Sequence, residues 1–316
     1  MIGRLHPALA VACFGLLLFP VPARAADFTF SLKTQDDDVR VEIDGKPFTV
    51  YRTSTGPKPI LWPVIGPTGA EMTRDFPMKD VAGEKPDHPH QRSIWFTHGD
   101  VNGVDFWSEM AGHGSIAHRE YLRKEASGKQ AVIATRNDWI DSKGKKVCED
   151  RRTLTFAAGA DWRSIDFEIT LMATDGPVKF GDTKEGSMGI RVPTVMDVDS
   201  QKGGHIVNSE GETDKEAWGK PASWVDYYGT VDKKAVGVAF MNHPSSFRYP
   251  TRWHVREYGL FAANPFGLKD FIGKSDADGS YTLDEGASIT VRYRMLFHLG
   301  DATSAKIVEA FQRYAR

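Results

Sequence analysis

The chain is poor in cysteine. It has two cysteines among 316 residues, and Cys13 lies in an N-terminal segment that we expect to be removed. Only Cys148 then remains, so neither an intrachain disulfide nor a cysteine-based metal site can form. A chain of this length can bury enough apolar surface to be stable without either.

The chain also lacks a strong excess of charge of either sign. It carries 40 basic and 42 acidic residues, and removing the N-terminal segment takes away Arg4 and Arg24, leaving 38 against 42, a net charge of −4. The chain therefore has no excess of basic residues that could bind nucleic acid, and we expect no nucleic-acid partner. The oligomeric state stays open.

Long apolar runs are absent except near the N-terminus. The run from Ala8 to Phe19 is too short to span a membrane, and the small-residue site Ala23-Arg24-Ala25 follows it. This pattern is typical of a secretory signal peptide over 1–25, cleaved before Ala26, with an uncleaved anchor as the alternative. We therefore expect an exported protein, periplasmic or extracellular, with no membrane span after cleavage.

Several catalytic motifs are missing as well. We find no phosphate-cradling glycine loop, no dinucleotide fingerprint and no Gly-x-Ser-x-Gly nucleophile elbow. Nucleotide-dependent enzymes and serine hydrolases of that type are therefore disfavoured.

What the chain does have is strand periodicity. Residues 165–171 alternate apolar and polar side chains, and 39–43 do the same before an Asp44-Gly45 turn. Similar strands are expected at 28–32, 48–51, 60–65, 133–140, 147–156, 187–192, 235–241 and 289–297. We expect a long ordered loop over 66–92, a further loop over 199–220, and one helix from about 301 to 314.

These elements predict one mainly β domain over 26–316. Many antiparallel strands with one closing helix favour a single large β-sandwich with a C-terminal α-helix. By fold-level resemblance, a galactose-mutarotase-like supersandwich is one form that such a sandwich could take.

The densest group of polar and aromatic side chains lies at 87–107. Its candidate site residues are His88, His90, Gln91, Arg92, Trp95, His98 and Trp107. Because imidazole changes charge near neutral pH, we expect His90 and His98 to transfer protons and the others to bind substrate. Alternatively, His88, His90 and His98 would bind one divalent metal ion, or a histidine would only hold the loop to backbone.

Two further segments supply candidates. Glu185 is the expected general base, and Arg191 is expected to bind a ligand oxygen, with simple ion pairs as the alternative for both. Alternation at 252–258 would place Arg252, His254, Arg256 and Tyr258 on one strand face, of which Arg252 and His254 are candidate binding residues. His243, after a buried-strand pattern, is the last candidate.

Three stretches resemble the hallmark sequences of the PmoA family, a bacterial family of unknown function automatically labelled "methane oxygenase". They are DHPHQRSIWFTHG (87–99), KEGSMGIR (184–191) and WHVREYGLFAANPFG (253–267). The resemblance covers nearly the whole mature chain, and it implies no catalytic residue or cofactor. We do not expect the helical membrane fold of the methane monooxygenase subunit of the same name, because this chain is rich in strand patterns.

The sequence favours a carbohydrate-active enzyme of lyase, hydrolase or epimerase type with a cleft lined by His, Glu and Arg side chains. Its ligand would be a small molecule or a glycan. The alternatives are a non-catalytic glycan- or partner-binding module, and a metal-dependent oxidation. The cofactor is left open, with a divalent metal as the one candidate.

Overall fold

A computed structural model describes residue 3 and residues 28–316 of the chain. The expected signal peptide, apart from Gly3, lies outside the described residues. Within the described part, no helix is long and apolar enough to cross a membrane.

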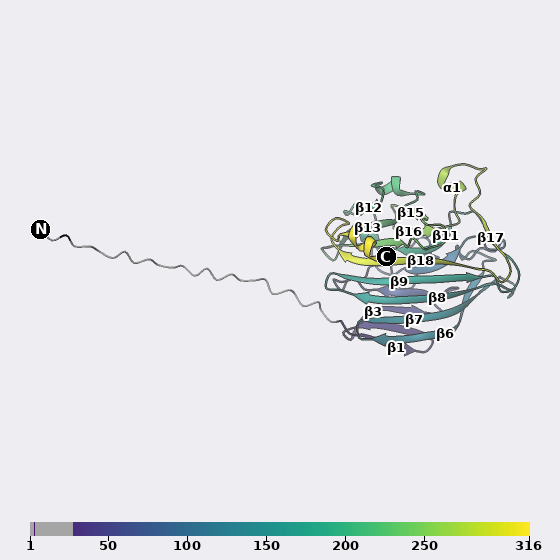
Figure 1. Ribbon diagram of the computed structural model, residues 1–316, viewed down its shortest axis with the longest axis horizontal. Helices are drawn as coiled ribbons and strands as arrows, with labels where there is room; N and C mark the ends of the chain where they lie inside the picture. Colours follow the sequence, from purple (N-terminus) through teal and green to yellow (C-terminus); the bar gives the residue numbers. More distant parts are fainter. Residues whose placement is uncertain (1–2, 4–27) are drawn as a thin grey trace.

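Two large antiparallel sheets form the body of the protein (Figure 1). The first sheet contains, in spatial order, β1 (Phe30–Gln35), β2 (Asp38–Ile43), β3 (Lys46–Arg52), β4 (Ile60–Val64), β5 (Ile94–His98), β11 (Gly186–Arg191), β16 (Leu260–Asn264) and β15 (Arg252–Val255). The second contains β12 (His205–Asn208), β13 (Trp224–Val231), β14 (Lys234–Asn242), β18 (Ser288–Leu299), β9 (Trp162–Met172), β8 (Lys146–Ala158), β7 (Gln130–Ile140) and β6 (Ser115–Ser127). The expected mainly β sandwich is confirmed.

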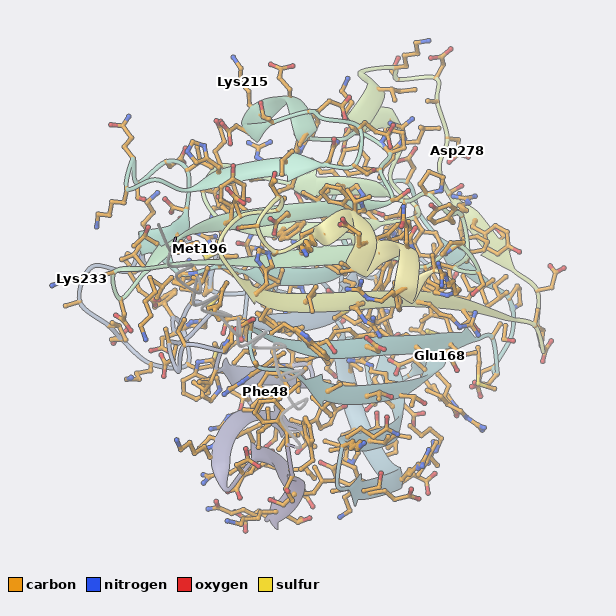
Figure 2. All side chains as sticks on the ribbon, turned by 60° about the vertical axis from the view of Figure 1, so that its left-hand side comes forward. Phe48, Glu168, Met196, Lys215, Lys233 and Asp278 are labelled. Carbon is orange, nitrogen blue, oxygen red and sulfur yellow. The ribbon has the colours of Figure 1, made fainter. Side chains whose placement is uncertain are left out.

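The sheets pack through one apolar interior because each strand alternates buried and outward side chains. In β18, Ile289, Val291, Tyr293, Met295 and Phe297 all point into this core. Figure 2 shows Phe48 inside the sandwich and Glu168 on the outward side of β9. The cross-strand pairing of β9 with β18 and with β8 fixes the register of the second sheet.

The smaller elements are β10 (Val178–Phe180) paired with β17 (Tyr281–Leu283), and the helices η1 (Thr194–Met196), η2 (Asp214–Ala217), α1 (Lys269–Ile272) and α2 (Ile307–Tyr314). The prediction of a continuous loop over 199–220 is wrong at β12 and η2, because β12 pairs with β13.

The C-terminal helix is confirmed but begins later than expected. Asp301 accepts a hydrogen bond from the backbone N–H of Ser304, so it closes a separate turn instead of capping the helix. Lys306 then adopts a left-handed conformation immediately before α2. The helix covers the outer face of the second sheet, where Ile307 and Ala310 pack against Trp224 and Leu296.

Candidate functional site

The three resembling stretches lie on neighbouring strands of the first sheet. β5, β11, β16 and β15 are adjacent, and their register aligns Trp95, Gly189, Ala262 and His254 in one row across the sheet. Their strand neighbours point into the core, so this row lies on the outer face, away from the second sheet. The fold thus brings segments from 87 to 267 together on one surface.

Small residues in this row make room for aromatic rings. A Cβ atom on Gly189 would lie 2.6 Å from Cζ2 of Trp95, so the indole occupies the space that a side chain would need. Trp95 packs against Trp107, with ring centroids 5.2 Å apart. Both tryptophans are fully buried, with Ile60, Leu260 and Ala262 around them.

Polar and aromatic side chains gather on this outer face, with Trp95 and Trp107 as their floor, and we call the whole group the outer-face cluster. It consists of His88, His90, Trp95, Trp107, Glu185, Arg191 and Tyr258. His88 stacks on Tyr258 at 5.0 Å and contacts His90 edge-on at 5.8 Å. The Trp107 ring lies 6.3 Å from His90. Polar groups among aromatic faces are the composition of a small-molecule site.

His90 is the imidazole of the outer-face cluster that could take part in proton transfer. Its imidazole makes no hydrogen bond to any residue that the structure describes, although its ring is half-buried. Burial, Lys58 and His88 lower the pKa of His90 to about 4, against the opposing influence of Glu109 and Glu185. The imidazole is therefore neutral at physiological pH and has a free nitrogen lone pair.

Asp87 joins two buried arginines beneath the cluster. Its carboxylate accepts hydrogen bonds from Arg74 Nη1 at 2.5 Å and Arg191 Nη2 at 2.9 Å. Burial works to raise the pKa of Asp87, but the guanidinium groups of Arg191 and Arg74 outweigh it, and the pKa is lowered. Arg191 also donates to Gln91 Oε1 at 2.5 Å, so both predicted residues are held rigidly in place.

A second carboxylate, Glu109, is shared by two more cations. Arg92 donates to it from Nε and Nη2 at 2.9 and 2.8 Å, and Lys58 Nζ lies 2.7 Å away. Lys58 is fully buried, and this burial lowers its pKa to about 8 in spite of Glu109. Arg92, which was expected to bind substrate, is instead paired with Glu109, and it holds Glu109 and Lys58 near His90.

Glu185 lies at the edge of the cluster, immediately before β11. Its side chain is about one third exposed and pairs with Lys184 Nζ at 2.9 Å. Its carboxylate is close enough to affect the pKa values of both His90 and Tyr258. The ion pair that the sequence left open as an alternative is therefore present, and the carboxylate still faces the cluster.

His98 does not join the cluster. β5 places it on the same side as Ile94 and Phe96, so it points into the interior, 4.9 Å from the ring of Phe266. Nε2 lies 2.8 Å from the carbonyl oxygen of Gly181, and the Ser187 hydroxyl lies 3.2 Å from Nδ1. The expected single cleft shared by His90 and His98 is thus corrected, because strand alternation separates them.

The other predicted residues are spread over the molecule. Trp253 points into the core and His254 to the outer face, as expected, but His254 is buried, with Nδ1 2.9 Å from the carbonyl oxygen of Lys184. Arg252 donates to the carbonyl of Gly219 at 2.8 Å. His243 lies at the far sheet, where its ring contacts Tyr314 of α2. Placing His243 in the same cleft is therefore also corrected.

The sequence analysis missed several residues that shape the site. Lys58, Arg74 and Glu109 carry no local pattern that marks them, because their partners are distant in sequence. Tyr258 was expected by alternation on the same strand face as His254, but it was not among the candidate binding residues.

The candidate metal site is not formed. His88 and His90 are neighbours, but His98 lies in the interior. In the described part of the chain, which is residue 3 and residues 28–316, no group of three His, Cys, Asp or Glu side chains is placed to hold a metal ion. The residues present therefore do not fit the three-histidine site that the sequence left open.

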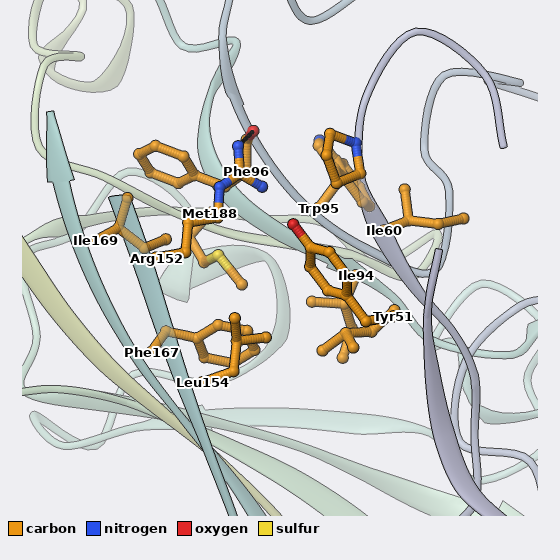
Figure 3. Close-up of a pocket in the computed structure, with 12 residues that line it drawn as sticks. Tyr51, Ile60, Ile94, Trp95, Phe96, Arg152, Leu154, Phe167, Ile169 and Met188 are labelled. Carbon is orange, nitrogen blue, oxygen red and sulfur yellow. Dashed lines mark hydrogen bonds between the residues drawn. The ribbon is translucent and has the colours of Figure 1, made fainter. Parts of the chain in front are cut away.

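The cavities of the molecule differ in what they could hold. Figure 3 shows Tyr51, Ile94, Leu154, Phe167 and Met188 pointing toward one another between the sheets, around a cavity of about 20 Å³. That volume is enough for about one water molecule. A cavity of about 260 Å³ borders the outer-face cluster at Tyr258 and is also lined by Trp218 and Arg256. A third, of about 690 Å³, lies beside α2.

Comparison with known families gives a match over most of the chain. A family model described as "Family of unknown function (DUF6807)" matches residues 38–312. No curated protein sequence matches the chain. The resemblance to the PmoA family stays a prediction, since none of these comparisons tests it.

Several solved structures are similar at low sequence identity. The GH36 alpha-galactosidase AgaA from Geobacillus stearothermophilus is 10% identical, with 87% of this chain and 41% of that chain covered and a TM-score of 0.45. Galactose mutarotase-like proteins from Clostridium acetobutylicum and Lactobacillus casei ATCC 334 are 10% and 8% identical, with 86% and 85% of this chain and 99% and 100% of theirs covered, and TM-scores of 0.42 and 0.40.

The expected galactose-mutarotase-like type is thus among the similar solved structures. The chain spans less than half of the length of the alpha-galactosidase.

Proposed function

The chain belongs to DUF6807, a family of unknown function, and on that premise we propose that it is an exported carbohydrate-active enzyme whose site is the outer-face cluster. The proposal depends mainly on one observation. The His90 imidazole is neutral, makes no hydrogen bond to any described residue and lies near the Glu185 carboxylate. Export is inferred from the signal-like N-terminus alone.

In this proposal, the neutral His90 imidazole accepts a proton from the substrate, and the Glu185 carboxylate stabilises the positive charge that then develops on the imidazole ring. A pKa of about 4 keeps the His90 imidazole in the form that can accept a proton at neutral pH. Arg191 and Lys58 would stabilise negative charge that develops on the substrate, because both are cationic and buried. Such chemistry would serve an elimination, an epimerisation or a hydrolysis.

Polar side chains next to a cavity that the Trp218 and Tyr258 side chains line support a sugar ligand. Sugar rings present C–H edges that pack on aromatic faces, while their hydroxyl groups need polar partners. The volume of this cavity is about 260 Å³, which has the order of size of a small-ligand site.

The proposal is tested by turnover assays on the mature chain with a panel of glycosides and free sugars. His90→Gln and Glu185→Gln are expected to lower turnover about 100-fold or more while the protein stays folded. His205→Gln and Glu210→Gln, on exposed side chains, are matched controls that keep full activity. Full activity in His90→Gln would refute the proposed proton transfer.

A second candidate is a glycan-binding module without turnover. It is favoured by the ion pair of Lys184 with Glu185, because this pair already engages the carboxylate that would take part in turnover. In that case, a sugar would bind at the cluster, as seen by calorimetry, and no product would form on prolonged incubation with wild-type protein.

A further inference from the structure

The outer-face cluster and its surroundings contain an unusual excess of hydrogen-bond donors. Five buried N–H groups have no acceptor among the residues that the structure describes. They are Arg74 Nε, Trp95 Nε1, Trp107 Nε1, Arg191 Nε and Trp218 Nε1. Buried N–H groups are nearly always paired, so five such groups in one region indicate a place where acceptors are supplied from outside the chain.

The corresponding acceptors are found elsewhere. The buried oxygens Asn137 Oδ1 and Asp226 Oδ2 also have no partner among the described residues, but they lie on β7 and β13 of the second sheet. The second sheet also holds His118 Nδ1 and the Tyr293 hydroxyl without a partner, so the difference is that the five N–H groups around the outer-face cluster have no unpaired side-chain amide or carboxylate oxygen near them in the described part of the chain.

The charges beneath the cluster show the same imbalance. Asp87 is shared by Arg74 and Arg191, and Glu109 is shared by Lys58 and Arg92. Each carboxylate thus faces two cations, and three of the four cations are at most 1% exposed.

Two other acidic groups near the buried cations are already engaged, while Asp199 and Glu257 line the neighbouring cavity together with Arg256. Asp197 lies near Arg191 but pairs with Lys85 Nζ at 3.2 Å. Asp105 lies near Lys58, but it accepts hydrogen bonds from the backbone N–H groups of Trp107 and Ser108. The Lys184–Glu185 pair is balanced, and the Arg256 guanidinium lies over the rings of Trp218 and Tyr258, with no ion pair to any residue that the structure describes.

We propose that the outer-face cluster binds a sugar that carries a carboxylate, such as a uronic acid. This inference depends on the function proposed above and specifies its substrate class. A carboxylate accepts several hydrogen bonds at once and balances buried positive charge, whereas a neutral sugar brings no charge and donates as well as accepts. Arg256, on the rim between Trp218 and Tyr258, is exposed and placed to meet the ligand at the entrance.

The test uses the mature chain and matched pairs of sugars, glucuronate against glucose and galacturonate against galactose. Binding is measured by calorimetry at 50 and 500 mM NaCl, and the indole N–H signals are followed by NMR. Trp95→Phe and Trp107→Phe assign those signals. We expect each acid to bind at least tenfold more tightly than its neutral counterpart, with weaker binding at high salt and shifts of the Trp95 and Trp107 indole signals.

Two variants locate the site. Arg256→Gln is expected to weaken binding of the acid about tenfold without changing the unfolding midpoint. Arg313→Gln, which removes an exposed cation at the cavity beside α2, is the matched control and leaves the affinity unchanged.

The outcomes separate the two proposals. If the neutral sugars bind as tightly as the acids and shift the same indole signals, the acidic-sugar inference is overturned and the carbohydrate function stands. If no sugar of either class binds the folded protein, the proposed function itself is refuted. A third outcome is that the acid binds, Arg313→Gln weakens this binding, and both indole signals stay unmoved. That result would overturn the assignment of the binding site to this cluster.

Discussion

His88 and Tyr258 stack face to face, with ring centroids 5.0 Å apart and planes only 4° from parallel. Arg191 lies 4.7 Å from the centre of the same tyrosine ring. Tyr258 therefore connects the histidine pair to the buried arginine, and its ring, more than its hydroxyl, holds the outer-face cluster together.

A first prediction separates the ring of Tyr258 from its hydroxyl group. Tyr258→Phe loses only a long hydrogen bond from Gln91, at 3.5 Å, so the free energy of unfolding should change by less than about 1 kcal/mol. Tyr258→Ala loses the stack and the cation–π contact, so it should cost about 1–3 kcal/mol and abolish sugar binding. Urea denaturation and calorimetry check both. Equal losses in the two variants would contradict the role given to the ring.

A second prediction concerns the buried ion pair between the sheets. Asp150 accepts from Arg152 Nε and Nη2, and also from Asn137 and Trp139, at 2.7–2.8 Å. Asp150→Asn would leave the charge of Arg152 buried without a counterion, which should destabilise the protein by about 3–5 kcal/mol. Glu125→Gln breaks the exposed pair with Arg123 and serves as the control, for which no shift in the urea midpoint is expected. An unchanged urea midpoint in Asp150→Asn would contradict the role of Asp150 as the stabilising counterion of Arg152.

A third prediction follows from the burial of His98, which lowers its pKa to about 4. An unfolded chain binds a proton at this residue near pH 6.5, whereas the folded chain does not. The contribution of neutral, buried His98 to the free energy of unfolding is therefore complete above pH 6.5. It is lost as the pH falls toward 4, by up to about 3 kcal/mol. Urea unfolding at pH 7.5 and 4.5 measures this difference.

Replacing His98 isolates its share of this acid sensitivity. His90 and His254 also have lowered pKa values, about 4 and about 3, and they keep their contributions in a His98 variant. His98→Gln retains an N–H donor for Gly181, so the loss of stability between pH 7.5 and 4.5 should become smaller. His205→Gln, on an exposed histidine, should keep the wild-type loss. An unchanged loss in His98→Gln would rule out His98 as a source.

The fold could be predicted from the sequence wherever one face of a strand is buried. The alternation at 289–297 and 165–171 is a direct consequence of an apolar core on one side. The start of α2 could not be predicted, because Asp301 fits a helix cap and a separate turn equally well. β12 and η2 were missed because their segment is polar, and β12 is ordered by pairing with β13.

The candidate site could be predicted only as a set of segments. The stretches 87–99, 184–191 and 253–267 do meet, because β5, β11, β16 and β15 are adjacent. Which histidines meet depends on where β5 begins, since His90 precedes the strand and His98 ends it on the inner side. Lys58 and Glu109 meet across 51 positions of sequence, and no local pattern reports such a pair.

A last prediction concerns the close approach of Trp95 to Gly189. A Cβ atom at Gly189 would lie 2.6–3.0 Å from three atoms of the indole, so Gly189→Ala must displace the ring. We expect a cost of about 1–3 kcal/mol and weaker sugar binding, since the ring forms the floor of the cluster. Gly229→Ala is the milder control, because its nearest contact is the flexible Met196 side chain at 3.1 Å.

A double-mutant cycle then tests the cause of that cost. Trp95→Phe removes the part of the indole that contacts Gly189, so adding it to Gly189→Ala should restore room for the new methyl group. The double variant should lose about 0.5–3 kcal/mol less unfolding free energy than the two single variants lose together, as measured by urea denaturation. If the two losses simply add, the methyl group at position 189 acts on the backbone of β11 and not on the Trp95 ring. The space left by Gly189 would then not be what accommodates the indole.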